Sequence, residues 1–473
     1  MRKEIAFLKK VQNSVFFDAI RFLEKRNIEF YIVGGAIRDF LRGKENIKDL
    51  DIIIPFDPEK IIYEIAKKTG GTPFLLDEKR KEWRIVIKSE YTLDIGEIEI
   101  DIEHDLSERD FSINAIAFKF PENFFIDKFN GFYDIEKKIV RAFKKENLIK
   151  DPLRILRAFR FMATLGFEIE KETFKFIKEN REKILDSAKE RIMREIYIMF
   201  SQGIRIYSTL LKMRESKVLF TLIPELKELD GCLQIYNNRT LDILSHTLNS
   251  LKYLENFYKN WRKTFFKEYE KEINRIFDPQ GRVLLFISLI FHDIAKPLTR
   301  KIENGKTKFH GHDKIGANIA YNWAKRMRFS ERFAKRLKEM VFWHMYPHLL
   351  GKEEELTKRA LFRYLRKTEE IWFLLFVQAY ADFRATPPGK NPSYLKNLLR
   401  KIYDFKIEIE REKPKPLING YDLIALGLKP GPIFKKILTE IEELKAEDVL
   451  KTKEEALNFV KEKYIIKGNM QKG

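Results

Sequence analysis

The hydrophobic periodicity of the chain changes near Asp151, and this change limits the folds that it can adopt. Before it, short apolar runs such as 30–33 and 50–54 lie between Gly-rich or charged breaks, a pattern typical of strands and turns. After it, apolar side chains recur at helical spacing over 153–165, and Gly166 ends that stretch as a helix C-cap would. The sequence therefore predicts an N-terminal α/β domain followed by a long all-α region.

The composition of the chain limits which binding partners and which cellular compartment we expect for it. The 473 residues suffice for two to four domains, and 91 Lys and Arg against 71 Asp and Glu give a net charge of +20. Such an excess attracts a polyanion, although charge alone does not choose among RNA, DNA and anionic lipid. The longest apolar run, 283–291, is far shorter than the roughly 18 residues of a membrane span, so we expect no membrane partner. The single cysteine, Cys232, fits a reducing cytosol, and we expect a cytoplasmic protein.

A pair of aspartates is the first candidate site. Asp49 and Asp51 are two residues apart in an expected strand, so both side chains point to the same face. Two adjacent carboxylates repel each other unless a cation lies between them, and such a pair can hold the metal ions of phosphoryl transfer. The preceding Gly34-Gly35 turn would open a helix whose free N–H groups suit a triphosphate, with Arg38 nearby. An exposed acidic strand end and a plain tight turn are the alternative interpretations.

Two motifs that contain these residues resemble a known family. Gly-Gly-x-x-Arg-Asp followed by Asp-Leu-Asp resembles the signature of polymerase-beta-like nucleotidyltransferases. Glu-Arg-Asp-Phe-Ser-Ile-Asn-Ala at 108–115 is similar to a motif of class II tRNA nucleotidyltransferases and bacterial poly(A) polymerases. The resemblance implies that Asp94 is a third catalytic carboxylate beside Asp49 and Asp51. It also implies nucleotide contacts for Gly34, Gly35, Arg38, Asp39, Arg109, Asp110 and Asn114. Glu108 departs from the motif, because the family usually has an Arg there.

The start of the first long helix carries side chains that can read a base. At Asp151 and Arg154, a carboxylate can accept from an amino group while a guanidinium donates to the adjacent ring nitrogen, which matches cytosine and adenine but neither guanine nor uracil. The segment is similar to the family's nucleotide-reading helix, which implies roles for Arg157 and Arg160 and makes CTP and ATP the substrates. Lys150 replaces the family's Glu and adds a basic group near the triphosphate. A solvated basic face of an amphipathic helix is the alternative interpretation.

Six of the seven histidines lie between residues 246 and 348. Together with two aspartates they resemble the HD superfamily, which implies a second divalent metal site with the ligands His246, His292, Asp293 and Asp382. Imidazole and carboxylate groups suit a transition metal that activates water for phosphoester hydrolysis. A buried core histidine is the alternative for each position taken alone, and the sequence leaves open whether the site is catalytic or structural.

The resemblance covers nearly the whole chain and implies four parts. Residues 1–145 form a nucleotidyltransferase head, 146–235 a helical neck and RNA-binding body, 236–400 an HD domain, and 401–473 a helical RNA-binding tail.

The implied reaction is template-independent addition of C, A or both from CTP and ATP to the 3′ end of tRNA. It would use Mg²⁺ at Asp49 and Asp51 and contacts to the acceptor and T-stem. The stretch 70–84 lacks an evident form of the loop that the family uses to switch from CTP to ATP. A CC-adding enzyme that relies on a separate A-adding enzyme is therefore one expectation, and CCA and A addition stay open. Poly(A) synthesis, or a metal phosphohydrolase whose N-terminal domain only binds nucleotide, are the remaining alternatives.

Overall fold

The chain folds into two compact units, Met1–Pro224 and Glu225–Gly473. The structure is a computed structural model that describes residues 2–78, 81–236, 239–303, 306–353, 355–386, 392–412, 416–447 and 449–466. Within these ranges, no helix is both long and apolar enough to cross a membrane. The four-part division inferred from the sequence stays a prediction.

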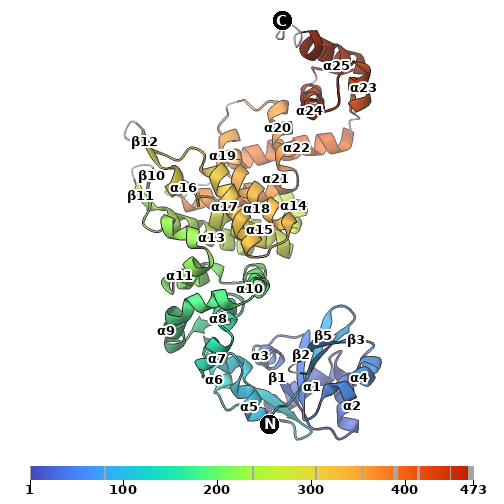
Figure 1. The fold of residues 1–473 in the computed structure, drawn as a ribbon, viewed down its shortest axis with the longest axis vertical. Coiled ribbons are helices and arrows are strands. Elements are labelled where there is room, and N and C mark those ends of the chain that lie inside the picture. The colour runs from blue at the N-terminus through green and yellow to red at the C-terminus, as the bar shows by residue number, and fades with distance from the viewer. Residues whose placement is uncertain are drawn as a thin grey trace. The chain divides into compact units, whose positions relative to one another are not determined.

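The first unit is built on a seven-stranded sheet with the strand order β3-β4-β5-β2-β1-β6-β7 (Figure 1). Its strands are β1 (Phe30–Val33), β2 (Asp49–Ile54), β3 (Thr72–Asp77), β4 (Glu82–Ile87), β5 (Tyr91–Glu97), β6 (Ala117–Phe120) and β7 (Phe124–Ile126). Strands β2 and β5 run parallel, whereas every other neighbouring pair is antiparallel. The N-terminal part is therefore the α/β domain that the sequence predicts.

One face of this sheet is covered by helices α1 (Arg2–Gln12), α2 (Phe17–Lys25) and α4 (Ile62–Thr69). Phe7 of α1 packs on Phe118 of β6, with ring centroids 4.9 Å apart. Because side chains alternate along a strand, the neighbours of such core residues point to the opposite face. Asp51, which is paired with Val33 of β1, lies on that opposite face. The alternation thus places Asp51 on the face opposite Phe118, beside a second buried apolar cluster that includes Val33 and Ile53.

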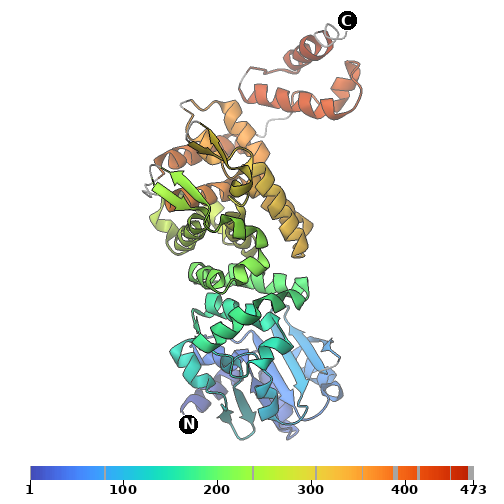
Figure 2. The same cartoon turned by 60° about the vertical axis from the view of Figure 1, so that its left-hand side comes forward.

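Helices make up most of the rest of the first unit, and Figure 2 shows them beside the sheet from a second direction. They are α3 (Gly35–Leu41), α5 (Ile102–Ser107), α6 (Gly131–Lys137), α7 (Glu146–Lys150), α8 (Leu153–Leu165), α9 (Lys171–Asn180), α10 (Lys189–Gln202), α11 (Ile206–Glu215) and α12 (Val218–Leu222). The predicted helix over 153–165 is α8, and Gly166 caps it with a φ of 75°. A short parallel pair joins β8 (Ile139–Val140) to β9 (Glu168–Ile169).

The second unit is helical, as the periodicity predicts. Its helices are α13 (Ile243–Asn260), α14 (Glu270–Ile276), α15 (Pro279–Phe291), α16 (Lys296–Thr299), α17 (His312–Arg326), α18 (Glu331–Trp343), α19 (Tyr346–Leu350), α20 (Lys358–Thr368), α21 (Trp372–Ala385), α22 (Ser393–Glu412), α23 (Gly420–Ala425), α24 (Pro432–Ala446) and α25 (Lys453–Val460).

Two hairpins interrupt these helices, against the expectation of an all-helical region. They pair β10 (Leu233–Tyr236) with β11 (Arg239–Asp242), and β12 (Lys301–Glu303) with β13 (Lys306–Lys308). An Asn-Gly pair separates β12 from β13 in the sequence, which is a strong local hairpin signal. This signal was available in the sequence, but the surrounding helical periodicity obscured it.

A buried glutamate fastens the C-terminal helices to the remainder of the second unit. Glu443 of α24 is 4% exposed, and its carboxylate accepts hydrogen bonds from three arginines of α20. The donor atoms are Nε of Arg359 at 3.0 Å, Nη2 of Arg363 at 2.6 Å and Nη2 of Arg366 at 3.2 Å. Three guanidinium groups thus compensate the burial of one carboxylate.

Replacing this carboxylate should loosen the contact between α24 and α20. We expect Glu443→Gln to lower the free energy of unfolding of the second unit by about 1–3 kcal/mol, because three cationic donors lose their charged acceptor. Hydrogen exchange would show faster exchange in α24, whereas the exposed control Glu454→Gln should have little effect. Unchanged protection of α24 in the Glu443 variant would contradict this role.

Candidate active site and histidine cluster

Three carboxylates lie on one face of the sheet where β2 and β5 run side by side; Asp51 and Asp94 line a cavity there, whereas Asp49 is exposed and is not among its lining residues. The register pairs Asp51 with Asp94, and Asp49 with Thr92, whose hydroxyl donates to the Asp49 carboxylate. Because the strands are parallel and the residues alternate, all three aspartates share one face of the sheet. Burial raises the pKa of Asp51 to about 6, and the Asp94 carboxylate contributes to the rise. A cation at this position would relieve the repulsion between the Asp51 and Asp94 carboxylates.

An arginine that the sequence gave no reason to select holds the third carboxylate. Arg84 of β4 donates from Nε to Asp94 Oδ1 at 2.7 Å and from Nη2 to Oδ2 at 2.6 Å. The two residues are partners in the β4–β5 register. That pairing fixes the orientation of Asp94 toward the face that carries Asp51.

Gly34 allows the chain to pass close to this site. Its φ is 74° and its ψ is −128°, a conformation that only glycine adopts without strain. A Cβ atom here would lie 2.8 Å from Arg109 Nη1 and 3.2 Å from Asp51 Oδ2. The glycine therefore leaves room for both side chains at the start of α3, which begins at Gly35.

A buried carboxylate joins the sheet to the first long helix. Asp110 accepts from Asn114 Nδ2 at 2.8 Å and from Arg157 Nε at 2.8 Å, and Asn114 Oδ1 accepts from Arg38 Nη1 at 2.6 Å. Burial alone would raise the pKa of Asp110, but Arg157 and the hydrogen bond from Asn114 lower it to about 2. Four side chains that the sequence motifs select are thus members of one network, which links α3, the 110–114 segment and α8. Arg38 also pairs with Asp39.

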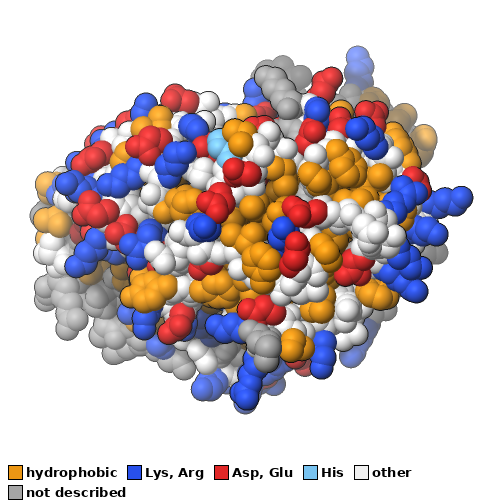
Figure 3. Space-filling model, turned by 90° about the horizontal axis from the view of Figure 1, so that it is seen from below, with side chains coloured by type: hydrophobic (Ala, Val, Ile, Leu, Met, Phe, Trp, Pro, Cys, Tyr) orange, Lys and Arg blue, Asp and Glu red, His pale blue; other side chains and the backbone are white. Residues whose placement is uncertain are grey.

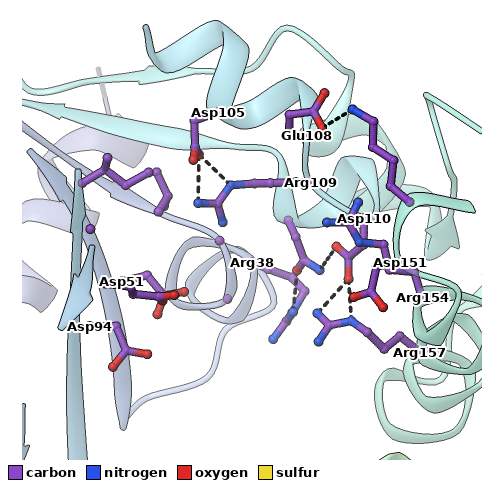
Figure 4. A pocket seen from close by; sticks show the side chains of 18 of the residues that line it. Arg38, Asp51, Asp94, Asp105, Glu108, Arg109, Asp110, Asp151, Arg154 and Arg157 are labelled. Atoms are coloured by element: carbon purple, nitrogen blue, oxygen red, sulfur yellow. Dashed lines mark hydrogen bonds and ion pairs between the residues drawn. The ribbon is translucent and has the colours of Figure 1, made fainter. Parts of the chain in front are cut away.

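These groups line an open cavity of about 870 Å³ in the first unit. Figure 4 shows Asp51 and Asp94 on one side of it and the α8 side chains Arg154 and Arg157 on the other, with Arg38 between them. The cavity therefore has an acidic wall on the sheet and a basic wall on the helix.

The predicted base-reading residues lie at the helical side of this cavity. Asp151 accepts from Arg191 Nη2 of α10 at 2.8 Å, and Arg154 Nη1 donates to the Asn147 carbonyl at 3.3 Å. Sequence reasoning did not assign Arg191, which enters the site from a helix 40 residues further along the chain.

Arg160 plays a second part besides lining the cavity. Its Nε donates to the buried Glu195 of α10 at 2.5 Å. This ion pair joins α8 to α10. Arg160 therefore has a structural role in addition to the predicted contact with the nucleotide.

Glu108 and Lys150, the two departures from the family motifs, bind each other. Lys150 Nζ donates to Glu108 Oε2 at 2.6 Å, and Lys144 Nζ donates to Oε1 at 2.9 Å. These hydrogen bonds lower the pKa of Glu108 to about 2. Lys150 lines the cavity, and its ammonium group also binds Glu108, so the pair ties the motif at 108–115 to the residue before Asp151.

The second unit contains a cluster of metal-ligand side chains in its helical core. Atoms of these residues form two groups, in each of which all ligand atoms lie within 4.8 Å of one another: His246, His292 and Asp382, and Asp293, His312 and His344. The resemblance assigned four of the six. His312 and His344 were recognised in the sequence only as part of the unusual density of histidines.

The cluster is buried and internally polar. His246 Nε2 lies 2.8 Å from Asp382 Oδ1, and His292 Nε2 lies 3.2 Å from Asp293 Oδ2. Burial lowers the pKa of His344 to about 3. Burial also lowers that of His292, but the Asp293 and Asp382 carboxylates outweigh it and raise the pKa to about 10. The two carboxylates therefore need positive charge between the rings, which a proton or a metal ion can supply.

Comparison with known families matches three parts of the chain. Residues 30–141 match the Poly A polymerase head domain, 166–229 the probable RNA and SrmB-binding site of polymerase A, and 243–366 the HD domain.

Curated relatives and solved structures cover nearly the full chain. A CC-adding tRNA nucleotidyltransferase of Thermus thermophilus is 30% identical over 439 residues, which is 90% of this chain and 92% of that protein. An A-adding tRNA nucleotidyltransferase of Deinococcus radiodurans is 28% identical over 91% of this chain and 94% of that protein. The Thermotoga maritima CCA-adding enzyme complexed with tRNA has a TM-score of 0.57 at 19% identity, with 93% of this chain and 92% of that chain covered.

The geometry of the site and the similarity to these proteins together indicate the class of protein. The part of the chain that carries Asp51 and Asp94 matches the Poly A polymerase head domain, a later part matches the HD domain, and the relatives are nucleotidyltransferases, which makes this chain a member of that class. The chain belongs to the tRNA nucleotidyltransferase family.

The Glu108–Lys150 pair can be tested by exchanging its charges. Lys150→Glu should reduce both thermal stability and the kcat/KM of nucleotide incorporation, because two carboxylates then face each other beside Asp151. We expect a loss of about 0.5–1 kcal/mol, the usual scale for a partly exposed ion pair. The double variant Glu108→Lys/Lys150→Glu should recover part of the loss.

Lys175→Glu, the same charge change on an exposed position of α9, serves as the control. If the losses of stability and of kcat/KM in the double variant equalled the sum of the losses in the two single variants, the pairing would have no positioning role.

Proposed function

We propose that the chain transfers C or A nucleotides, or both, from CTP and ATP to the 3′ end of tRNA, with release of pyrophosphate. The observation that carries the proposal is the parallel pairing of β2 and β5, which brings Asp51 and Asp94 together in the cavity that Arg38 and Arg109 also line. Acidic groups for metal ions and basic groups for a triphosphate are thus present at one place.

The proposed site residues have two different roles, metal binding and triphosphate binding. Asp49 and Asp51 would hold Mg²⁺, with Asp94 beside them, and the bound ions would supply positive charge that favours attack of a 3′ hydroxyl on the α-phosphate. Arg38 and Arg109 line the same cavity as Asp51 and would provide fixed positive charge for the triphosphate. No covalent intermediate with the protein is required.

Base selection would fall to Asp151 and Arg154. A carboxylate acceptor beside a guanidinium donor matches the amino group and ring nitrogen of cytosine and of adenine. Guanine and uracil present the opposite order, so either would place a donor against a donor and an acceptor against an acceptor, and be rejected. The contact of Asp151 with Arg191 supports this role, because it restrains the carboxylate at the cavity wall.

The tRNA would be held through shape and charge, at its acceptor and T-stem. On the face seen in Figure 3, Lys and Arg side chains are interspersed with Asp and Glu. The net charge of the whole chain is +20, and we expect salt-dependent binding through many weak phosphate contacts. The cytoplasm, which the single cysteine favours, is where we place this activity.

A second candidate activity belongs to the HD domain. We propose that His246, His292, Asp293 and Asp382 bind a divalent transition metal for phosphoester hydrolysis. The supporting observation is that His292 is 1% exposed and its Nε2 has no hydrogen-bond partner, although it points at two carboxylates. Imidazole and carboxylate groups fit such an ion.

The two activities are separable by substitution. Asp51→Asn should reduce nucleotide incorporation by about a hundredfold or more, since it removes a charged metal ligand. Any metal-dependent phosphohydrolase activity should remain. The exposed control Asp18→Asn on α2 should behave as the unchanged chain. Full incorporation by the Asp51 variant would exclude the proposed site.

Defined transcripts would determine which nucleotides are added. tRNA transcripts that end at the discriminator base, at C or at CC are incubated with labelled CTP or ATP, and product lengths are read on a gel. Extension by C alone identifies CC addition, extension of only the CC transcript by A identifies A addition, and both identify CCA addition. A long A tail on any RNA would favour poly(A) synthesis, and no extension at all would refute the proposal.

A further inference from the structure

A row of side chains crosses the sheet from the candidate active site to the edge of the sheet. The register pairs Asp51 of β2 with Asp94 of β5, and Asp94 with Arg84 of β4. Arg84 is paired in turn with Phe74 of β3, the strand at the edge of the sheet. Residues that are paired directly across neighbouring strands point to the same face of a sheet. Phe74 therefore lies on the face that carries the two carboxylates, two strand spacings or about 10 Å from Asp94.

The opposite face of β4 packs on a helix. Trp83 of β4 is 8% exposed and contacts Tyr63 of α4, with ring centroids 5.8 Å apart. Leu75 of β3 is paired with Trp83 and so lies on this same face. Phe74, the preceding residue, points the other way and is 44% exposed. A single apolar side chain on a surface is ordinary, but this ring lies in line with the proposed catalytic carboxylates.

The cationic side chains of the cavity come from the other side of β2. Arg38 belongs to α3, which follows β1, and Arg109 belongs to the segment that leads into β6. In the strand order, β1 and β6 lie on one side of β2, whereas β5, β4 and β3 lie on the other side. Figure 4 shows Arg38 and Arg109 to one side of Asp51 and Asp94. A triphosphate bound by these arginines would therefore extend from the carboxylates toward β1 and β6.

The geometry of the reaction leaves the β4 and β3 side for the RNA. In nucleotidyl transfer, the attacking 3′ hydroxyl and the leaving pyrophosphate lie on opposite sides of the α-phosphate, roughly in line. Because the pyrophosphate would lie toward β1 and β6, the 3′-terminal nucleotide would approach over β4 and β3. Arg84 lies along this path with its charge compensated by Asp94, and Phe74 lies at its end.

We propose that Phe74 stacks on the base of the 3′-terminal nucleotide of the RNA that is being extended. An aromatic ring offers a flat surface to any base, so a contact of this kind tolerates different sequences. Such tolerance suits an enzyme whose RNA substrate can end in a different nucleotide after an addition. The inference rests on the nucleotidyl transfer proposed above and adds to it a contact for the end of the RNA.

The chain offers a matched control for this contact. Phe74→Ala and Leu75→Ala each remove a large apolar side chain that is 44% exposed, from adjacent positions on opposite faces of β3. The kcat/KM for the tRNA transcript is measured at a saturating concentration of the nucleotide that the unchanged chain incorporates. We expect this kcat/KM to fall about 5- to 100-fold in Phe74→Ala, the effect of losing one base stack. It should stay unchanged in Leu75→Ala.

Two further variants keep the test independent of the alanine variant. Phe74→Trp should retain the kcat/KM of the unchanged chain, because an indole ring also stacks on a base. Phe74→Leu keeps an apolar side chain but has no flat ring, so it should show the loss expected of Phe74→Ala even where the alanine variant does not fold. The KM for the nucleotide should be the same in all these chains, because Phe74 lies away from the triphosphate.

A transcript without its terminal base separates stacking from an effect on the fold. This tRNA ends in an abasic nucleotide that keeps its 3′ hydroxyl. The unchanged chain should extend it with a loss of kcat/KM similar to the loss that Phe74→Ala causes on the normal transcript. Phe74→Ala and Phe74→Leu should lose nothing further on the abasic transcript, because the stacking contact is already absent.

The outcomes distinguish this contact from the reaction itself. No extension of any tRNA by the unchanged chain would refute the proposed function. Extension by the unchanged chain, with the same kcat/KM in Phe74→Ala and Phe74→Leu, would overturn the stacking contact and leave the proposed function intact. If the Phe74 variants lost the same factor on the abasic transcript as on the normal one, the ring would not act through the base, and the inference would also be overturned.

Discussion

The active site depends on the hydrogen bonds that the buried carboxylate of Asp110 accepts. It receives hydrogen bonds from Asn114 and Arg157, and Asn114 in turn holds Arg38. Removing one partner of such a buried charged pair typically costs about 3–5 kcal/mol. Without Asp110, the helix that carries Arg154 would lose the ion pair between Arg157 and the 110–114 segment.

The sheet supplies the other half of the site through its register alone. Phe7 of α1 packs on the face that carries Phe118, whereas Asp51 and Asp94 lie on the opposite face. A shift of β5 by one residue would turn Asp94 into the core and place a neighbouring side chain next to Asp51. Arg84, on the next strand, stabilises the observed register because it donates two hydrogen bonds to Asp94.

Much of this arrangement was predictable from the sequence because its signals are local. The apolar run at 30–33, the alternation around Asp51 and the helical spacing that ends at Gly166 correspond to β1, β2 and α8. Each of these patterns lies within about a dozen residues, where the periodicities of 2 and 3.6 residues separate strands from helices.

The contacts that were missed join residues far apart in the chain. Arg84 meets Asp94 only because of the strand register, and Arg191 reaches Asp151 only because α10 packs on α8. The same holds for His312 and His344, which come together from the start of α17 and the end of α18. Composition and spacing carry no information about such pairings, which arise from tertiary packing.

The most direct measurement compares the kcat/KM for CTP with that for UTP on a tRNA transcript, in the unchanged chain and in Asp110→Asn. If the Asp110 network positions the base-reading helix, the folded variant should use CTP about tenfold less efficiently or worse, a loss of about 1.4 kcal/mol or more. It should also discriminate less against UTP. A folded Asp110→Asn variant that retains the full preference for CTP over UTP would contradict the account.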